Sequence, residues 1–245
     1  MVKLGALVLG LLSLTTEVCA QRAVRIMPFG ASIVSRCWRA NLQTSLRAAG
    51  ITNFEFVGSQ TSTCSGTNID QDHEGHPGSQ ATAWAATTNL VAKLKQNPPD
   101  VVIMLIGTND VLIGQKPIVQ ILASYDVLIS QMRASNSRMQ IIFSNLLPLD
   151  PARFKATPVQ GIKDLNAAIA TYIATQNTAQ SPVRFVDNFS GFDAVRDTDD
   201  GEHPNLTTGV QKMAAKFFGP TRDAIRAVSA AKRVRTVSVR WRNRV

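Results

Sequence analysis

The chain has 245 residues, of which 44% are hydrophobic, and a formal net charge of +9. This length and composition fit one globular domain with a full hydrophobic core, and they exclude a chain that is disordered throughout. Residues 226–245 hold seven basic residues and no acid, which leaves only +2 for the rest of the chain. So small a surplus does not indicate a nucleic-acid-binding domain, and we expect no nucleic-acid partner.

Residues 1–20 have the three parts of a secretory signal peptide. Lys3 supplies the basic start, Leu4 to Leu14 the apolar stretch, and Val18 to Ala20 the small-residue cleavage site. The apolar stretch is short for a membrane span, and no later stretch is long enough for one. The sequence therefore predicts a secreted, extracellular protein without a membrane partner, whose mature chain begins at Gln21.

Residues 21–225 alternate between strand-like and helix-like segments, as expected of one α/β domain with a parallel sheet. The expected strands are Val24–Met27, Phe54–Gly58, Val101–Ile106, Gln140–Ser144 and Arg184–Val186. The expected helices are Trp38–Ala49, Thr87–Gln96, Ile118–Ala134, Val159–Gln176 and Thr207–Arg226. The run from Val101 to Ile106 is apolar throughout, which places it in the middle of the sheet. The composition of residues 226–245 predicts a disordered basic tail.

Three cysteines are present, and Cys19 would leave with the signal peptide. In an oxidising compartment the remaining pair, Cys37 and Cys64, is expected to form one disulfide. Two buried free thiols are the alternative. A thiol count on the denatured, unreduced protein distinguishes the two.

Near the end of the domain, Asp200 stands three residues before His203. On one helical turn the two side chains would share a face, so that the carboxylate orients the imidazole. A hydrolytic triad also needs a nucleophile on a sharp turn after a strand, and Ser32 follows the strand that begins at Val24. We therefore expect Ser32, Asp200 and His203 to form a catalytic triad.

Further polar segments follow the expected strands, at the sheet edge where ligands of open parallel sheets bind. They are Gly30-Ala31-Ser32, His76-Pro77-Gly78-Ser79, Gly107-Thr108-Asn109-Asp110 and the segment from Asp200 to Asn205. The long irregular stretch 60–83 is predicted to be a functional loop. A metal site there is the alternative, although the spacing of the ligand types fits no standard site. Those ligand types are Asp70, Asp72, His73, Glu74 and His76.

These segments, in this order, resemble the conserved blocks of the SGNH (GDSL-like) hydrolase superfamily. A finer resemblance, to the acetylxylan esterases of carbohydrate esterase family 3, covers residues 24 to about 220. It is carried by Arg25-Ile26-Met27-Pro28, Cys37-Trp38-Arg39, Asp72-His73-Glu74-Gly75-His76, Gly107-Thr108-Asn109-Asp110 and Asp200-Gly201-Glu202-His203-Pro204-Asn205. The resemblance implies a three-layer α/β/α sandwich with a five-stranded parallel sheet, similar to flavodoxin.

The same resemblance implies Ser32 as nucleophile, His203 as general base and Asp200 as the partner that orients His203. It also implies an oxyanion hole made of the backbone N–H groups of Ser32 and Gly78 and the side-chain amide of Asn109. Three preorganised donors would stabilise the charge that develops on an attacked ester carbonyl. The implied protein is a monomer that removes acetyl esters from xylan or related plant polysaccharides and needs no cofactor and no metal.

One position departs from the family's Gly-Asp-Ser block, because Ala31 stands where the family has aspartate. The family aspartate helps to order the site through hydrogen bonds, so Ala31 is expected to lower the rate and to leave the triad intact. Two alternatives stay open. One is an enzyme of the same fold that acts on lipid or other short-chain acyl esters, and the other is a non-catalytic carbohydrate-binding protein.

Two sequons, at Asn188 and Asn205, are candidate glycosylation sites in a secreted protein. Asn205 follows His203 so closely that a glycan there would crowd the site, and we expect glycosylation only at Asn188. Trp38 and Trp84 are candidate sugar platforms, although a tryptophan is more often part of the core.

Overall fold

The computed structural model describes residues 22–242, with side chains described as far as residue 232. The predicted signal peptide, residues 1–20, lies outside the described residues. None of the helices in residues 22–242 combines the length and the hydropathy that a membrane crossing requires.

The centre of the molecule is a parallel sheet built outward from β1 (Val24–Gly30). On one side β1 pairs with β5 (Val101–Leu105), and the sheet continues through β6 (Gln140–Ser144) to β7 (Val183–Val186). Because all four strands are parallel, their carboxyl ends meet at one edge. That edge carries the loops that hold the polar segments singled out in the sequence.

The other side of β1 is shared by two short strands. β2 (Phe54–Phe56) pairs in parallel with the first half of β1, and β4 (Asp72–Gly75) pairs in parallel with the second half. The two-residue strand β3 (Gln60–Thr61) runs antiparallel to β4 at the outer edge. The five predicted strands are therefore confirmed. β3 and β4 were not predicted, because their short polar segments have no apolar alternation and depend on the open edge beside β1.

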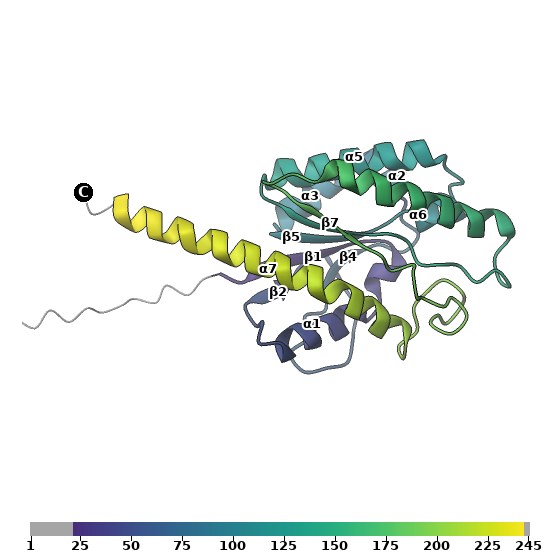
Figure 1. Ribbon diagram of the computed structural model, residues 1–245, viewed down its shortest axis with the longest axis horizontal. Coiled ribbons are helices and arrows are strands. Elements are labelled where there is room, and N and C mark those ends of the chain that lie inside the picture. The colour runs from purple at the N-terminus through teal and green to yellow at the C-terminus, as the bar shows by residue number, and fades with distance from the viewer. Residues whose placement is uncertain (1–21, 243–245) are drawn as a thin grey trace, which may run out of the picture.

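Helices cover both faces of the sheet (Figure 1). On one face α1 (Trp38–Ala48) packs against α7 (Gly209–Arg242). The opposite face holds α2 (Ala81–Ala85), α3 (Asn89–Gln96), α5 (Ile118–Ser135) and α6 (Ala156–Gln176). Two short helices, the 3-10 helix η1 (Ser32–Ser35) and α4 (Thr108–Leu112), follow β1 and β5. The predicted three-layer α/β/α sandwich is confirmed.

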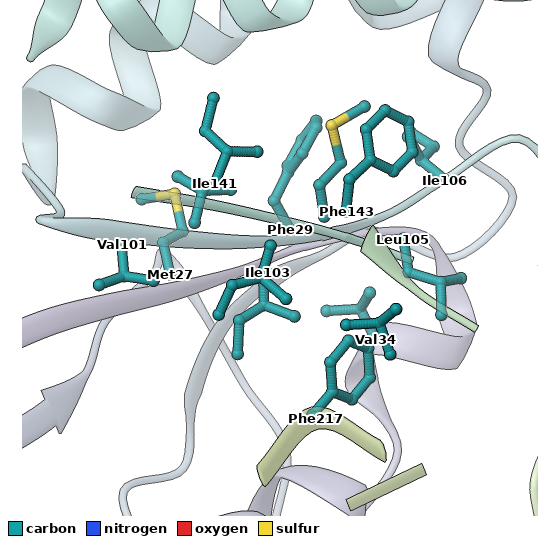
Figure 2. Close-up of a cluster of buried hydrophobic side chains, with 14 of the residues drawn as sticks. Met27, Phe29, Val34, Val101, Ile103, Leu105, Ile106, Ile141, Phe143 and Phe217 are labelled. Atoms are coloured by element: carbon teal, nitrogen blue, oxygen red, sulfur yellow. The ribbon is translucent and has the colours of Figure 1, made fainter. Parts of the chain in front are cut away.

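The core extends through both faces of the sheet, as Figure 2 shows. Phe29, Ile141 and Phe143 point to one side of the strands, and Leu105 and Phe217 lie on the other. All five side chains are at most 1% exposed. Burial on both faces is what the continuous apolar run of β5 predicted, since a strand covered by two helical layers needs no polar face.

The carboxyl-terminal helix is longer than predicted. The sequence indicated a helix ending at Arg226 and a disordered tail over residues 226–245, but α7 continues to Arg242. Val228 packs against the core, and Lys232 Nζ donates to Asp100 Oδ2 at 2.9 Å. Residues 226–242 are thus helical where the sequence predicted a disordered tail, and the contacts of Val228 and Lys232 tie the part of α7 up to residue 232 to the domain. Residues 243–245 lie outside the described residues.

The predicted glycosylation site at Asn188 is also corrected. Asn188 is 2% exposed, and its Nδ2 donates a hydrogen bond of 2.7 Å to Ser144 Oγ. A glycan is attached through that same nitrogen and must reach solvent, so the folded chain has no room for one at Asn188. A sequon identifies an asparagine that could be glycosylated, but it does not show whether that side chain is exposed in the folded protein.

Candidate active site

Ser32 lies on a tight turn directly after the central strand β1. The turn starts at Gly30, where a Cβ would come within 1.9 Å of the carbonyl oxygen of Leu105 on the neighbouring strand. Only glycine permits this close approach. Ser32 then begins η1 beyond the carboxyl end of β1, the strand that pairs with β4 on one side and β5 on the other. The strand order reverses at this point, and such switch points are where ligands of open α/β sheets bind.

Buried side chains stabilise this turn through hydrogen bonds to its backbone. Trp38 Nε1 donates to the carbonyl oxygen of Ile33 at 2.9 Å, and Arg39 donates to that of Ser35 at 3.1 Å. Both Trp38 and Arg39 are 0% exposed, and burial lowers the pKa of Arg39 to about 10 despite the opposing charge of Asp72. Trp38 and Trp84, which is 9% exposed, are thus core residues and not sugar platforms.

The three predicted triad residues lie in hydrogen-bond contact. His203 Nε2 is 2.7 Å from Ser32 Oγ, and His203 Nδ1 is 2.7 Å from Asp200 Oδ2. The carboxylate can only accept, so Nδ1 carries the proton and the lone pair of Nε2 faces the Ser32 hydroxyl. This arrangement can remove a proton from the serine.

Asp200 is held as a carboxylate by backbone donors. Its Oδ1 accepts the N–H groups of His203 at 2.8 Å and Glu202 at 3.0 Å. Partial burial acts to raise the pKa of Asp200, but the hydrogen bonds from His203 and Glu202 outweigh it and lower the pKa to about 2. Asp200 therefore stays charged at any pH at which such a site would work.

The segment that carries Asp200 and His203 is a loop and not the helical turn that the spacing predicted. Thr198 and Pro204 form an isolated antiparallel bridge across it, and helix α7 begins only at Gly209. The aspartate side chain accepts the N–H groups two and three residues ahead, which folds the loop without helical hydrogen bonds. The two side chains still meet, but for this different reason.

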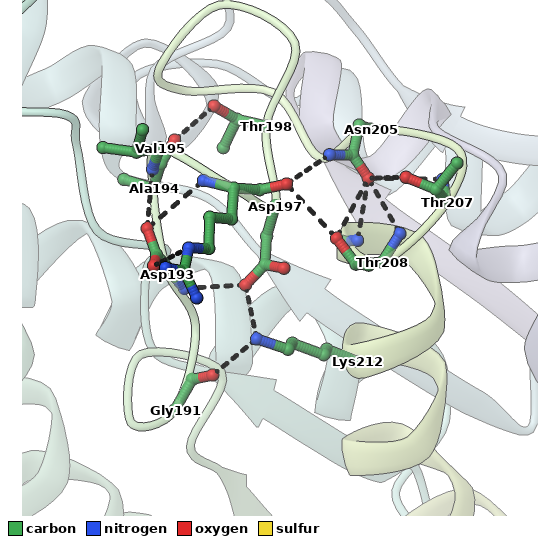
Figure 3. Close-up of polar contacts among 12 residues, drawn as sticks. Gly191, Asp193, Ala194, Val195, Asp197, Thr198, Asn205, Thr207, Thr208 and Lys212 are labelled. Carbon is green, nitrogen blue, oxygen red and sulfur yellow. Dashed lines mark hydrogen bonds and ion pairs between the residues drawn. The ribbon is translucent and has the colours of Figure 1, made fainter.

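A hydrogen-bonded scaffold anchors this loop (Figure 3). Asn205 Oδ1 accepts the N–H groups of Thr207, Thr208 and Gly209 at 3.2, 2.9 and 3.0 Å, which satisfies donors at the start of α7. Its Nδ2 donates to the carbonyl oxygen of Arg196 at 2.8 Å. Asn205 therefore positions the His203 loop through its side-chain amide.

Asp197 completes the scaffold from the buried side. It is 1% exposed, and its Oδ2 accepts Lys212 Nζ of α7 at 2.6 Å and the N–H of Asp193 at 2.7 Å. Its carbonyl oxygen accepts the N–H of Asn205 at 2.9 Å. Helix α7 and the catalytic loop are thus fixed to one another by a buried carboxylate.

The three predicted oxyanion donors line the same cleft as the triad. Ser32, Gly78, Asn109 and His203 all contribute to a cavity of about 710 Å³. Gly78 has a φ of +78°, and a Cβ there would meet nothing within 4 Å, so glycine is required by the backbone and the cleft above it is open. One N–H of Asn109 Nδ2 donates to the carbonyl oxygen of Ser79 at 3.0 Å, which points the amide toward the Gly78 loop.

Sequence reasoning missed the role of Asp110. This carboxylate is 0% exposed and accepts the N–H groups of Ala81 at 2.7 Å and Thr82 at 3.0 Å. It thereby fastens the loop that carries Gly78 to the helix that carries Asn109. A charged residue shortly after an entirely apolar run was the available signal, because a charged residue that becomes buried there needs hydrogen-bond partners.

The histidines and acids of stretch 60–83 serve the fold. His73 Nδ1 accepts the N–H of Gly75 at 2.9 Å, and burial lowers the pKa of His73 to about 3. Glu74, which is 0% exposed, accepts Ser59 Oγ at 2.8 Å and lies 2.6 Å from His76 Nε2. Asp70 accepts the N–H of Phe56 at 3.0 Å. Among residues 22–232, whose side chains are described, no group of three or more histidine, cysteine, aspartate or glutamate side chains could hold a metal ion.

The expected disulfide is present between Cys37 and Cys64. Cys37 lines the cleft together with Ser62 and Thr63. The bridge therefore fastens one wall of the cleft to the start of α1, directly beyond the Ser32 turn.

Comparison with known proteins places this site in a family. A sequence model of the GDSL-like lipase/acylhydrolase family matches residues 29–208. None of the curated proteins compared matches the chain. Among solved structures, one similar structure is that of an acetyl esterase, determined for a serine-to-alanine mutant with an acetate ion. It has 34% sequence identity and a TM-score of 0.76, and the match covers 84% of this chain and 99% of that chain.

Two further structures are similar. A carbohydrate esterase of family 3 from Talaromyces cellulolyticus has 34% identity and a TM-score of 0.76 over 83% of this chain and 99% of that chain. The family 3 carbohydrate esterase of Clostridium thermocellum has 29% identity and a TM-score of 0.70 over 84% and 98% of the two chains. The chain belongs to the GDSL-like lipase/acylhydrolase family and is an SGNH-type carboxylic ester hydrolase. Its resemblance to carbohydrate esterase family 3 is confirmed.

Proposed function

We propose that this protein is a secreted serine esterase that removes acetyl groups from xylan or related plant polysaccharides through Ser32, His203 and Asp200. The observation that carries the proposal is the 2.7 Å contact between Ser32 Oγ and His203 Nε2 in the same cleft as Gly78 and Asn109. The similar acetyl esterase with its acetate ion supports acetate as the acyl group, and the two carbohydrate esterases support a sugar as the alcohol.

The first half-reaction forms an acetyl-enzyme. His203 Nε2 takes the proton of Ser32 Oγ as the oxygen attacks the ester carbonyl, and Asp200 stabilises the imidazolium that results. The carbonyl oxygen becomes an oxyanion that accepts from the N–H groups of Ser32 and Gly78 and from Asn109 Nδ2. The C–O bond to the sugar then breaks, and His203 returns the proton to the leaving sugar oxygen.

The second half-reaction frees acetate. A water molecule gives its proton to His203 Nε2 and attacks the acetyl carbon, with the oxyanion again held by the same donors. The bond to Ser32 Oγ breaks, and His203 returns the proton to that oxygen. The enzyme is restored, and one ester and one water have become one sugar hydroxyl and one acetic acid, which ionises in solution.

Several features support a secreted enzyme that acts on a large polar substrate. The cleft is open and carries polar side chains at its rim, among them Arg36, Ser62 and Thr63. The disulfide is typical of an oxidising compartment, in agreement with the predicted signal peptide. A polysaccharide too large for a closed cavity can lie across such a cleft.

Acetate release from acetylated xylan tests the proposal. The parent and Ser45→Ala, which changes an exposed serine on the far part of α1, are expected to release acetate, and Ser32→Ala is expected to release none above background. Faster hydrolysis of longer acyl esters than of acetylated xylan would favour the alternative esterase. Xylan binding without acetate release, unchanged in Ser32→Ala, would identify a non-catalytic carbohydrate-binding protein.

A further inference from the structure

A second groove adjoins the catalytic cleft. It has a volume of about 930 Å³ and lies between α4, the loop that follows it, and the start of α6. Asn109 and Glu202 line both the groove and the catalytic cleft. A substrate that extends past these two residues from Ser32 therefore enters the groove.

The groove adjoins the residue that protonates the alcohol part of the substrate. His203 must reach the leaving sugar oxygen, and Glu202, the next residue in the chain, forms the border to the groove. Asn109, which also borders the groove, holds the carbonyl oxygen of the acetyl group together with the N–H groups of Ser32 and Gly78, so the sugar that bears this acetyl group lies close to the groove. The neighbouring part of a polysaccharide is the portion of the substrate that the groove can receive.

Backbone hydrogen bonds fix both walls of the groove. On one wall the N–H groups of Gly114 and Lys116 donate to the carbonyl oxygens of Asn109 and Asp110, each at 2.9 Å. On the other wall the N–H of Asp150 donates to the carbonyl oxygen of Gly201 at 3.0 Å. The walls are therefore attached to the segments that carry Asn109 and His203, and they form a preorganised surface.

The charge of the groove is positive. Its titratable lining residues are Lys116, Arg153, Lys155 and Glu202. Arg153 pairs with Asp150 at 3.4 Å, whereas the side chains of Lys116 and Lys155 have neither a hydrogen bond nor an ion pair within the described part of the chain. Lys116 and Lys155 thus bring to the groove two ammonium groups that are not paired with a carboxylate of the described residues, and they can bind a carboxylate of a ligand.

The remaining walls are suited to a sugar ring. Leu112, Ile113 and Phe154 line the groove, and Ile113 is 62% exposed. Apolar walls with a few charged groups are typical of small-molecule sites, and a pyranose ring presents apolar C–H faces together with polar edges. A sugar that bears a carboxylate meets both properties of this surface.

We propose that this groove, which we call the lysine groove, binds a uronic acid residue of the acetylated polysaccharide, with its carboxylate between Lys116 and Lys155. The proposal rests on the proposed esterase function. The uronic acid in the groove would lie beside the acetylated sugar, past Asn109 and Glu202 from Ser32.

The experiment compares acetylated xylan that carries uronic acids with the same xylan after its carboxyl groups have been reduced to neutral alcohols. For the parent, the KM for the reduced xylan is expected to be about fivefold higher than that for the charged xylan, the effect of two partly exposed ion pairs. The double variant Lys116→Gln/Lys155→Gln is expected to have nearly equal KM values. Lys163→Gln, on the exposed side of α6, is the matched control and should keep the fivefold ratio.

Equal KM values for the two xylans in the parent would overturn the proposal. So would a preference that the double variant retains. A preference of the parent for longer acyl esters that Ile113→Ser removes would show that the groove holds an acyl chain, which also overturns it.

A binding measurement separates this proposal from the proposed function. Calorimetric titration of Ser32→Ala with a deacetylated oligosaccharide that carries one uronic acid requires no catalysis. Binding that weakens about fivefold when Lys116→Gln and Lys155→Gln are added supports the lysine groove even if the parent releases no acetate. Absence of binding in Ser32→Ala, together with normal acetate release by the parent, contradicts the groove alone.

Discussion

Ser32 and His203 meet at 2.7 Å, but different forces hold the two segments that carry them. The turn that carries Ser32 is held by the packing of buried side chains: Ile33, Val34 and Trp38 around Ser32 are at most 2% exposed. The loop over residues 198–205, which carries Asp200 and His203 and is called the acid–base loop below, is held by hydrogen bonds. The Asp200 side chain is 49% exposed, and the loop depends on Asn205 and Asp197 for its shape. The first segment should therefore respond to changes in volume, and the second to changes in hydrogen bonding and charge.

The largest expected loss of activity comes from replacing one carboxylate oxygen of Asp200 with an amide nitrogen. Asp200→Asn keeps the size of the side chain but offers an N–H to His203 Nδ1, so that imidazole would present its own N–H to Ser32 and could not accept its proton. We expect kcat to fall on the order of 10⁴-fold, as replacement of a triad aspartate does elsewhere. Asp164→Asn, at an exposed carboxylate on α6, is the control in the same assay. Near-parent activity of Asp200→Asn would show that the orientation of His203 does not depend on Asp200.

A smaller loss of kcat is expected when a donor of the proposed oxyanion hole is removed. Asn109→Ala removes one proposed donor to the oxyanion and should lower kcat by about 10²- to 10³-fold with little change in KM. Steady-state kinetics on acetylated xylan measure both constants. A rise in KM with unchanged kcat would show that Asn109 binds the substrate without stabilising the oxyanion.

The contribution of Asn205 to the acid–base loop can be tested through the stability of the folded protein. Asn205→Ala removes the acceptor of three N–H groups at the start of α7 and should lower the free energy of unfolding by about 1–2 kcal/mol. Urea unfolding at neutral pH measures the change. Asn205→Asp keeps the acceptor and should recover much of the loss, whereas equal losses in both variants would assign the effect to the Nδ2 bond to Arg196.

The pH dependence of stability distinguishes the charged loop from the packed turn. The pKa of Asp200 is lowered to about 2 from 3.8, so its hydrogen bonds stabilise the fold fully above about pH 5 and this contribution is lost as the pH falls toward 2. The difference in unfolding free energy between parent and Asp200→Asn should stay constant above about pH 5 and shrink below about pH 4. Urea unfolding at a series of pH values checks this. A difference that remains unchanged at pH 2 would contradict the lowered pKa.

The smallest expected effect concerns the packed turn. Ala31 is 5% exposed and occupies the cap position before η1, where it forms no side-chain hydrogen bond. Ala31→Asp supplies an acceptor for the N–H groups of η1 and should raise kcat by about twofold to fivefold, by ordering the Ser32 turn. Acetate release from acetylated xylan measures the gain. A loss of activity together with lower stability would mean that burial of the new carboxylate outweighs its hydrogen bonds.

The two segments also differ in how far the sequence predicted them. The position of Ser32 followed from local signals, a predicted strand over Val24–Met27 and the segment Gly30-Ala31-Ser32 that follows it. The contact between Asp200 and His203 was predicted from their spacing, but the helical turn assumed for it is absent, because the loop is shaped by side-chain hydrogen bonds from Asp200 to the backbone. Asp110 was singled out as part of a polar segment, but its role was not predicted, since its partners Ala81 and Thr82 lie far away in the sequence.

The sequence by itself determined the alternation of strands and helices, the buried central strand β5 and the residues at the carboxyl ends of the strands. These features depend on local patterns of apolar and polar residues, which are readable along the chain. Only the tertiary structure decided that β4 completes the edge of β1, that α7 extends to Arg242, that Asn188 is buried and that two grooves meet at Asn109 and Glu202. Each of these depends on contacts between distant segments, and a local pattern contains no information about which distant segment will cover or pair with it.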